Sequence, residues 1–539
     1  MFKKIADLDI GSIDAINYSG RKEKELLKRI FYKDAFLDRI LETKKYFIVG
    51  EKGTGKTAYA TYLSNGVYNS TNSTTKNINS TDYTKFYHLK QIGHLPVSDF
   101  IDTWKVILLL LLCDHIKENG RSRFGAPEKF KSAQQAIEKY YDSAFDPEVV
   151  SAIEFVKDAE ISAELLVKYA KLAASERSSV SASGTKFQTN LLIIEKSLKE
   201  AISSLDLRDD HILFIDGIDV RPSALSFTDY MECVRGLAFA VWQLNTEFLA
   251  NIRDSKGRIK VVLLLRPDIF DAVEFQNANA KMRDNSVNLS WITTYGDYRT
   301  SRIFQLVDGI LAKQTGHDPM IAGEAWDHYF NYDVPNMRIA ERLDNPFVSF
   351  LRYSFYRPRD VISYLGIMQE YVRQHNSGMM NFTDRVFLNC QKEYSDYLLG
   401  EVRDYLSFYY SSADFNELVG FFKFMKGKSK FSWDEFIENY TRFHAANSRE
   451  KLTLQQLKDG PEEFIQFLYS MNVVGYDEEA EHGPGRFVHW CFRDRTPVNL
   501  SPKIPTGLNA GRPYGVHPGL VRALQVGGEN EAKATHRRR

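Results

Sequence analysis

Residues 46–57 hold the feature that constrains the fold most: an apolar run followed by a glycine-rich turn that ends in Gly-Lys-Thr. The run Tyr46 to Val49 has the length and apolar character of a short buried strand. Residues 50–57 match the pattern G-x-x-x-x-G-K-T, and the residues after them favour a helix. A strand, a tight turn and a helix in this order are typical of an α/β fold with a parallel sheet.

The glycine-rich turn is predicted to hold phosphate groups. Its glycines allow the backbone to curl, so that N–H groups converge on an anion at the N-terminus of the helix. Lys56 can then reach the β- and γ-phosphates, and the Thr57 hydroxyl can bind Mg²⁺. The alternative is a turn without a ligand, but the flanking strand and helix favour a nucleoside triphosphate. The predicted binding set is Gly50, Gly53, Thr54, Gly55, Lys56, Thr57 and Ala58.

A second apolar strand, Ile212 to Ile215, ends in the acidic residue Asp216. In a parallel sheet the carboxyl end of this strand lies beside the glycine-rich turn, so Asp216 is predicted to hold Mg²⁺ directly or through water. Gly217 lets the backbone turn away, and Asp219 is placed to orient or deprotonate an attacking water. The alternative is that Asp216 and Gly217 form only a strand-ending turn.

Several arginines are candidates for contacts with the phosphates. Arg266 ends a third apolar strand and could sense the γ-phosphate, or it could instead pair with Asp268. Arg357 or Arg359, at the start of a later helix, could swing onto the nucleotide, or both could be solvated charges. The candidates for an arginine that acts on a neighbouring copy are Arg283, Arg299 and Arg302.

Composition excludes several classes of protein. The 539 residues carry 70 basic and 70 acidic side chains, so a grip on nucleic acid by the whole molecule is not indicated. The four cysteines have no paired spacing, which argues against a zinc site or a disulfide framework. The longest apolar stretch, Val106 to Cys113, is too short to span a bilayer, and the N-terminus lacks a signal-peptide core. We therefore expect a cytoplasmic protein without a membrane partner.

Four segments together resemble the AAA+ and STAND superfamily of P-loop ATPases: residues 50–57, 212–219, 263–268 and 357–360. The resemblance implies an ATPase that needs Mg²⁺, and that uses ATP to drive assembly or a conformational switch as a homo-oligomer or with a protein effector. The combination is similar to bacterial P-loop ATPases found in antiphage defence neighbourhoods. Val220 stands where many such ATPases carry a second acidic residue, so Asp219 must do that work or hydrolysis is slow.

The resemblance also divides the chain. It implies an α/β P-loop core with a parallel sheet and a helical insertion, a helical lid and a C-terminal winged-helix domain. Residues 120–205 are the predicted insertion, because they are mostly helical and charged and lie in a long gap between Thr57 and Asp216. The predicted ranges are 1–45 for a lead-in helix, 46–295 for the core, 296–375 for the lid, 395–525 for the winged-helix-like domain and 526–539 for a flexible tail.

Two other functions remain open from the sequence. The first is a DNA-binding loader, in which Arg486, His489, Arg493 and Arg495 form a basic wing on DNA. Because the net charge is zero and the wing has few cations, protein contact is slightly favoured over DNA. The second is a nucleotide-binding scaffold that barely hydrolyses, as Val220 suggests. Adenine is preferred over guanine by resemblance alone.

Overall fold

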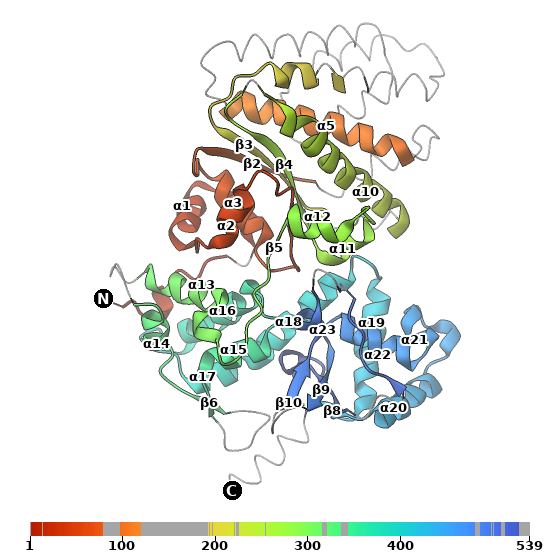
Figure 1. Cartoon of the computed structure of the whole chain (residues 1–539). Coiled ribbons are helices and arrows are strands. Elements are labelled where there is room, and N and C mark those ends of the chain that lie inside the picture. Colours follow the sequence, from red (N-terminus) through yellow and green to blue (C-terminus); the bar gives the residue numbers. More distant parts are fainter. Residues whose placement is uncertain are drawn as a thin grey trace, which may run out of the picture.

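A five-stranded parallel sheet forms the core of the protein, which is an α/β fold with many helices (Figure 1). The strand order is β2-β3-β4-β1-β5. The strands are β1 (Phe47–Val49), β2 (Thr71–Asn77), β3 (Asp210–Asp216), β4 (Ile259–Leu265) and β5 (Ser286–Asn288). This computed structural model describes residues 2–12, 14–78, 97–119, 192, 195–196, 198–219, 221, 226–253, 255–314, 321–335, 343–479, 486–496, 499, 501–507 and 512–527.

Successive side chains of each strand point to opposite faces of the sheet, and both faces are covered. Ile48, Phe214 and Leu264 pack into one hydrophobic cluster, whereas their neighbours in sequence pack into another. The first cluster contains residues of α1 (Arg21–Ile30), α2 (Ala35–Leu41) and α3 (Lys56–Ser64). The second contains residues of α5 (Val97–Asn119), α10 (Phe227–Gln243), α11 (Pro267–Ala272) and α12 (Ala278–Asp284).

The order of the strands creates a point where chain connections diverge. Strands β1 and β4 are neighbours, with Val49 opposite Leu265. The helix that follows β1 covers one face of the sheet, and the helix that follows β4 covers the other. In open parallel sheets, ligands bind beyond the carboxyl ends of the strands at such a divergence. The residues after β1, β3 and β4 meet there.

The sequence predicts a polar surface loop over residues 65–82, which are rich in Asn, Ser and Thr, and one helix over residues 22–43. Both predictions are wrong. Residues 65–82 were expected to be a polar surface loop, but Thr71–Asn77 is strand β2, paired with β3 from Asp210 to Asp216. A strand at the sheet edge with one hydrogen-bonded neighbour tolerates polar side chains, and threonine favours extended backbone. One helix was expected over 22–43, but it is split into α1 and α2, because Asp34 caps α2 and accepts a hydrogen bond from Phe36 N.

Part of the predicted organisation lies outside the described residues. This applies to the strand expected over 85–90, to residues 120–191 of the expected insertion, and to residues 528–539 of the expected tail. Two short 3₁₀ turns, Ile5–Asp7 and Ala15–Ser19, precede α1.

A group of helices follows the sheet (Figure 1). These helices are α13 (Arg302–Ala312), α14 (Glu324–Tyr329), α15 (Pro346–Tyr353), α16 (Pro358–His375), α17 (Asp384–Asn389) and α18 (Gln391–Leu406). Tight aromatic packing joins them: the rings of Tyr364 and Tyr394 stack 4.1 Å apart between α16 and α18. A two-stranded ribbon pairs β6 (Val334–Pro335) with β7 (Leu343–Asp344).

The C-terminal part contains a four-stranded antiparallel sheet of order β10-β9-β11-β8 with helices beside it. Its strands are β8 (Lys430–Phe431), β9 (Val474–Glu479), β10 (Arg486–His489) and β11 (Tyr514–Val516). Its helices are α19 (Ser412–Phe422), α20 (Trp433–Ala446), α21 (Gln455–Asp459), α22 (Pro461–Ser470) and α23 (Cys491–Asp494). None of the helices described is long and apolar enough to cross a bilayer.

Candidate functional site

A cavity of about 620 Å³ opens at the carboxyl ends of β1, β3 and β4. Its volume falls in the range of roughly 300–1,000 Å³ that small-molecule sites occupy. One end is polar and is lined by the glycine-rich turn; the other is largely apolar. The polar end includes Gly53, Thr54, Gly55, Lys56, Thr57, Ala58, Asp216, Asp219, Arg266 and Arg359, which are ten of the predicted site residues.

The glycine-rich turn depends on backbone conformations that favour glycine. Gly53 has φ +87°, and Gly55, which precedes the first residue of α3, has φ +95°. Gly50 lies behind the turn, where an added Cβ would lie 3.2 Å from Leu289 Cβ. Trp291 fixes the turn from outside, because its indole Nε1 donates to Thr54 O at 2.9 Å. The free N–H groups at the start of α3 therefore face the cavity in a fixed shape.

Lys56 lies inside the curl of the turn. Its ammonium donates hydrogen bonds to Gly50 O at 2.8 Å and to Glu51 O at 3.2 Å. Burial lowers the pKa of Lys56, and the carboxylates of Asp219 and Asp216 act in the opposite direction. A buried ammonium next to exposed amide groups makes this end of the cavity suited to an anion.

Thr57 and Asp216 meet although they come from different elements. The Thr57 hydroxyl donates to Asp216 Oδ2 at 2.6 Å, and Gly217 N donates to Asp216 Oδ1 at 2.8 Å. Burial raises the pKa of Asp216, an effect that nearby Asp219 adds to and the Thr57 hydrogen bond opposes. A nearby cation would relieve this cost of burying a carboxylate.

The donor set of this end fits Mg²⁺. Within the residues that the structure describes, no cluster of three or more His, Cys, Asp or Glu side chains is placed to bind a metal. Mg²⁺ needs no such cluster, because it binds through one or two protein oxygens, water and substrate phosphates. The hydroxyl of Thr57 and the carboxylate of Asp216 are oxygen ligands of this kind. Asp219 also lines the cavity, whereas Val220 lies outside the described residues.

Arg266 lies in the cavity wall, and its guanidinium has a partner within the chain. It donates from Nε to Asp268 Oδ1 at 3.0 Å and from Nη2 to Oδ2 at 2.5 Å. The ring of Tyr405 lies 4.2 Å from the guanidinium carbon, and Tyr409 also donates to Asp268. Burial alone would raise the pKa of Asp268, but the Arg266 guanidinium holds it below its ordinary value. The pairing that the sequence left as the alternative is therefore present.

The start of α16 packs directly on the glycine-rich turn. Arg357 donates to Lys52 O at 2.9 Å and forms a buried two-point ion pair with Asp360. The backbone N–H of Arg359 donates to Gly53 O at 3.3 Å, and its side chain lines the cavity. Arg357 is therefore structural in this state, whereas Arg359 presents its guanidinium to the site.

Sequence reasoning missed the apolar end of the cavity. The N-terminal segment before and within α1 forms much of it, and α13 and α16 complete it. The side chains there are Ile10, Ala15, Ile16, Tyr18, Leu27, Ile30, Phe31, Leu306, Ile310 and Ile362. Strong amphipathic patterning of α1 predicts a buried face, but not which ligand or element that face meets.

Contacts between Glu51 and the C-terminal part were also missed. Arg495 forms an ion pair with Glu51 and donates to Ser470 O at 3.0 Å. Burial alone would lower the pKa of Arg495, but Glu51 and other acidic groups raise it above its ordinary value. Nothing in the sequence connects two residues that are 444 positions apart.

The predicted basic wing is wrong for Arg495 and His489, because both are paired with acidic side chains. Arg495 is buried against Glu51, and His489 lies between Glu478 (2.7 Å) and Asp494 (3.0 Å). Arg493 lies over the ring of Tyr356 at 5.4 Å. The side chain of Arg486 is outside the described set. These cations were assigned to a surface because the sequence does not reveal their partners in other elements.

The three candidates for an arginine that acts on a neighbouring copy differ in their surroundings. Arg299 forms a two-point ion pair with Asp327 at 2.9 and 2.7 Å. Arg302 lies over the ring of Phe36 at 4.1 Å. Arg283 is exposed at the end of α12.

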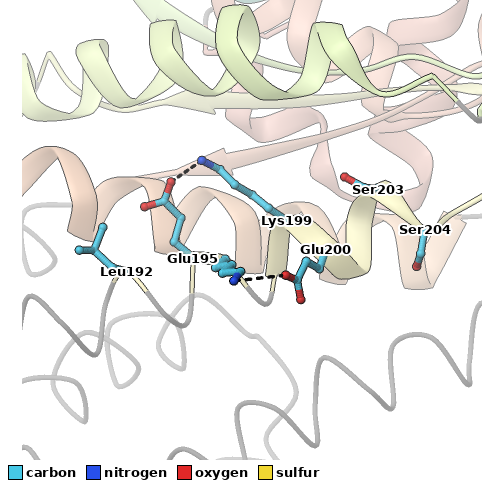
Figure 2. A pocket seen from close by; sticks show the side chains of 7 residues that line it. Leu192, Glu195, Lys199, Glu200, Ser203 and Ser204 are labelled. Atoms are coloured by element: carbon cyan, nitrogen blue, oxygen red, sulfur yellow. Dashed lines mark ion pairs between the residues drawn. The ribbon is translucent and has the colours of Figure 1, made fainter.

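A second hollow, of about 660 Å³, has no comparable chemistry. It is lined by residues of one helical stretch: Leu192, Glu195, Lys196, Lys199, Glu200, Ser203 and Ser204. Its lysines pair with glutamates of the same stretch: Lys199 with Glu195 at 2.5 Å, as Figure 2 shows, and Lys196 with Glu200 at 4.0 Å. Pairs one turn apart are typical of a solvated helix face, so the larger volume does not indicate the functional site.

No protein-family model matches the chain, and no curated protein matches it.

Proposed function

We propose that the protein binds and hydrolyses ATP with Mg²⁺ and works as a molecular switch that assembles with, or controls, a protein effector. The observation that carries the proposal is the meeting of Lys56, Thr57 and Asp216 at the polar end of one cavity. An ammonium, open backbone amides and a hydroxyl–carboxylate pair are the groups that a bound nucleotide with Mg²⁺ requires.

In this proposal the chain supplies positioning and electrostatic stabilisation. Amides at the start of α3 hold the phosphate oxygens, and Lys56 turns from Gly50 O to the β- and γ-phosphates. Thr57 and Asp216 would hold Mg²⁺, which neutralises charge on the phosphates. Asp219 orients the attacking water. The apolar end of the cavity, lined by Ile10 and Tyr18 among others, covers the base and ribose.

Arg266 contributes only if it exchanges Asp268 for the γ-phosphate. In the described state its guanidinium is paired with Asp268 at two points, so this role requires the aromatic cover from Tyr405 and Tyr409 to shift. Arg359 already lines the cavity, and within the described residues no hydrogen bond of its guanidinium would have to break before it reached a phosphate. We propose it as the residue that couples α16 to the nucleotide.

The arrangement of the chain supports a finer assignment. We propose that the α/β part is a P-loop NTPase core, that residues 296–375 are its lid, and that the C-terminal helices and four-stranded sheet are a winged-helix-like domain. The inward partners of His489, Arg493 and Arg495 favour a protein contact over DNA for this domain. A role in prokaryotic defence or regulation, in the cytoplasm and as an oligomer, rests on the resemblance of the motifs.

The test is nucleotide binding and turnover in variants of the polar end. Lys56→Ala should lower ATP turnover about 100-fold or more, since it removes a preorganised charge from the transferring phosphate. Leu192→Ala, in the second hollow, serves as a control and should leave turnover unchanged. Phosphate release with Mg²⁺ is the readout. Equal turnover in Lys56→Ala and the wild type would refute the proposed site.

A further inference from the structure

Glu401 is a buried carboxylate in a cavity that we assign to a polyphosphate. It lies on α18 and faces three cations from two other segments. Its Oε1 is 3.9 Å from Lys52 Nζ, and its Oε2 is 3.7 Å from Arg357 Nη1 and 3.6 Å from Arg359 Nη1. None of these is a hydrogen-bond distance, and Oε2 is buried without a hydrogen-bond partner among the residues that the structure describes. A buried charged oxygen in this condition is costly, so it needs an explanation.

The three cations differ in how firmly other groups hold them. Lys52 donates to Asp404 at 2.7 Å, and Arg357 is held by Asp360 and by Lys52 O. The Arg359 guanidinium makes no hydrogen bond within the residues described; its one ionic partner there is Glu401. Arg359 is thus the cation of the three that can change partner without breaking another contact.

A bound nucleotide would compete with Glu401 for this cation. Both groups are anions. The Glu401 carboxylate lines the cavity, and in the proposed function the phosphates occupy it. The carboxylate and the phosphates would repel each other strongly in this poorly solvated site. A phosphate would also offer Arg359 oxygens at hydrogen-bond distance, which Glu401 does not. On α18, Glu401 lies one turn before Tyr405, and Phe408 follows the end of the helix. The rings of Tyr405 and Phe408 cover Arg266 at 4.2 and 4.8 Å. A displacement of α18 at Glu401 would therefore also displace the aromatic cover on Arg266.

We propose that Glu401 is a positioning residue of the nucleotide site. It holds Arg359 back before a nucleotide binds, and it releases Arg359 to a phosphate oxygen when one does. The exchange links occupancy of the cavity to the position of α18 and of its aromatic cover on Arg266. This inference rests on the proposed function and adds to it a specific route from the nucleotide to α18.

A double-mutant cycle on the full-length chain tests it. The dissociation constant of a fluorescent N-methylanthraniloyl ATP with Mg²⁺ is measured for the wild type, Glu401→Gln, Arg359→Gln and the double variant. Glu401→Gln should tighten binding about fivefold, a coupling of ordinary size for linked sites. In the Arg359→Gln background the same change should alter binding less than about twofold, since the competing cation is gone. Asp396→Asn, an exposed carboxylate of α18 paired with Lys392, is the matched control and should bind as the wild type does.

The outcomes distinguish failure of this inference from failure of the proposed function. If Glu401→Gln tightened binding equally with and without Arg359, the effect would come from the loss of a negative charge alone, and the inference would be overturned. Unchanged or weaker binding in Glu401→Gln would also overturn it. If the wild type does not bind the probe, or Lys56→Ala binds it equally well, the proposed function fails and takes the inference with it. Glu401→Asp withdraws the carboxylate by one methylene and should bind with intermediate affinity, so the inference stays testable if Glu401→Gln does not fold.

Discussion

At the scale of single residues, Gly53 and Arg359 fit closely together in the site. A Cβ added at Gly53 would lie 3.1 Å from Arg359 Cβ, and its φ of +87° is unfavourable for alanine. Gly53→Ala should therefore destabilise the protein by about 1–2 kcal/mol and weaken nucleotide binding. Gly66→Ala is the control, because nothing lies within 4 Å of its added Cβ. Denaturant unfolding and nucleotide titration check both; equal stability of the two variants would contradict the packing argument.

A second residue-scale prediction concerns Asp216. Asp216→Asn keeps the size of the side chain but removes the charge proposed to hold Mg²⁺. Turnover with Mg²⁺ should fall about 100-fold, and the dependence of nucleotide affinity on Mg²⁺ should weaken. Burial raises the pKa of Asp216, so the amide should also fold at least as stably as the carboxylate. A variant that is much less stable would show that Asp216 serves the fold instead.

At the scale of elements, apolar strands were predictable and polar ones were not. Tyr46–Val49, Ile212–Ile215 and Val261–Leu265 were predicted as strands, and β1, β3 and β4 lie there. Continuous apolar runs identify strands that are buried on both faces. Strand β2 was missed because its threonines and asparagines resemble a loop, and only its pairing with β3 reveals it.

The candidate site also has one part that the sequence predicts and one part that it does not. The polar end follows from local motifs, so Lys56, Thr57 and Asp216 could be named together before their contacts were known. The apolar end and the partners of Glu51 and Glu401 come from elements that are remote in sequence, and no local pattern carries their positions. The roles of all these residues in catalysis remain predictions.

An element-scale prediction concerns the buried histidines that join α5 to the sheet. His211 Nδ1 lies 3.2 Å from His115 Nε2, and His115 Nδ1 lies 2.7 Å from the Thr74 hydroxyl. Burial lowers the pKa of His115 to about 3 and that of His211 to about 4, from 6.5. The folded state therefore binds fewer protons than the unfolded state, so this contribution to stability is complete above pH 6.5 and is lost as the pH falls towards 4.

Each histidine should cost on the order of 2 kcal/mol of stability between pH 6.5 and 5. His211→Gln should flatten this dependence, whereas His375→Gln, an exposed residue of α16, should not. The contribution of His489 to the pH dependence of stability has the opposite sign, because Asp494 raises the pKa of His489. His489 is present in both variants, so it does not affect their comparison. Unfolding by urea at pH 7 and pH 5 measures the slopes. The same slope in His211→Gln and the wild type would show that the pair is not buried in its neutral form.

At the scale of the whole molecule, one ion pair ties the C-terminal part to the sheet. Glu51 and Arg495 are 22% and 13% exposed, so removing one charge leaves the other poorly solvated. Arg495→Gln should lower the free energy of unfolding by about 2 kcal/mol, less than for a fully buried pair. It should also separate the melting of the C-terminal part from that of the core. Arg442→Gln, in an exposed pair with Glu438, is the control and should change stability by less than about 0.5 kcal/mol. Calorimetry of both variants measures the change in stability and shows whether the two parts melt separately.

The distance along the chain between these partners has a consequence for synthesis. The ribosome makes Glu51 early and Arg495 444 positions later, and the Arg357 contact to Lys52 spans 305 positions. Domains generally fold as they emerge, beginning from the N-terminus, so the sheet can form long before either anchor exists. A nascent chain that has made Trp291 but neither arginine thus carries a glycine-rich turn that still lacks two of its contacts. The turn gains the later of these two contacts only when Arg495 is made.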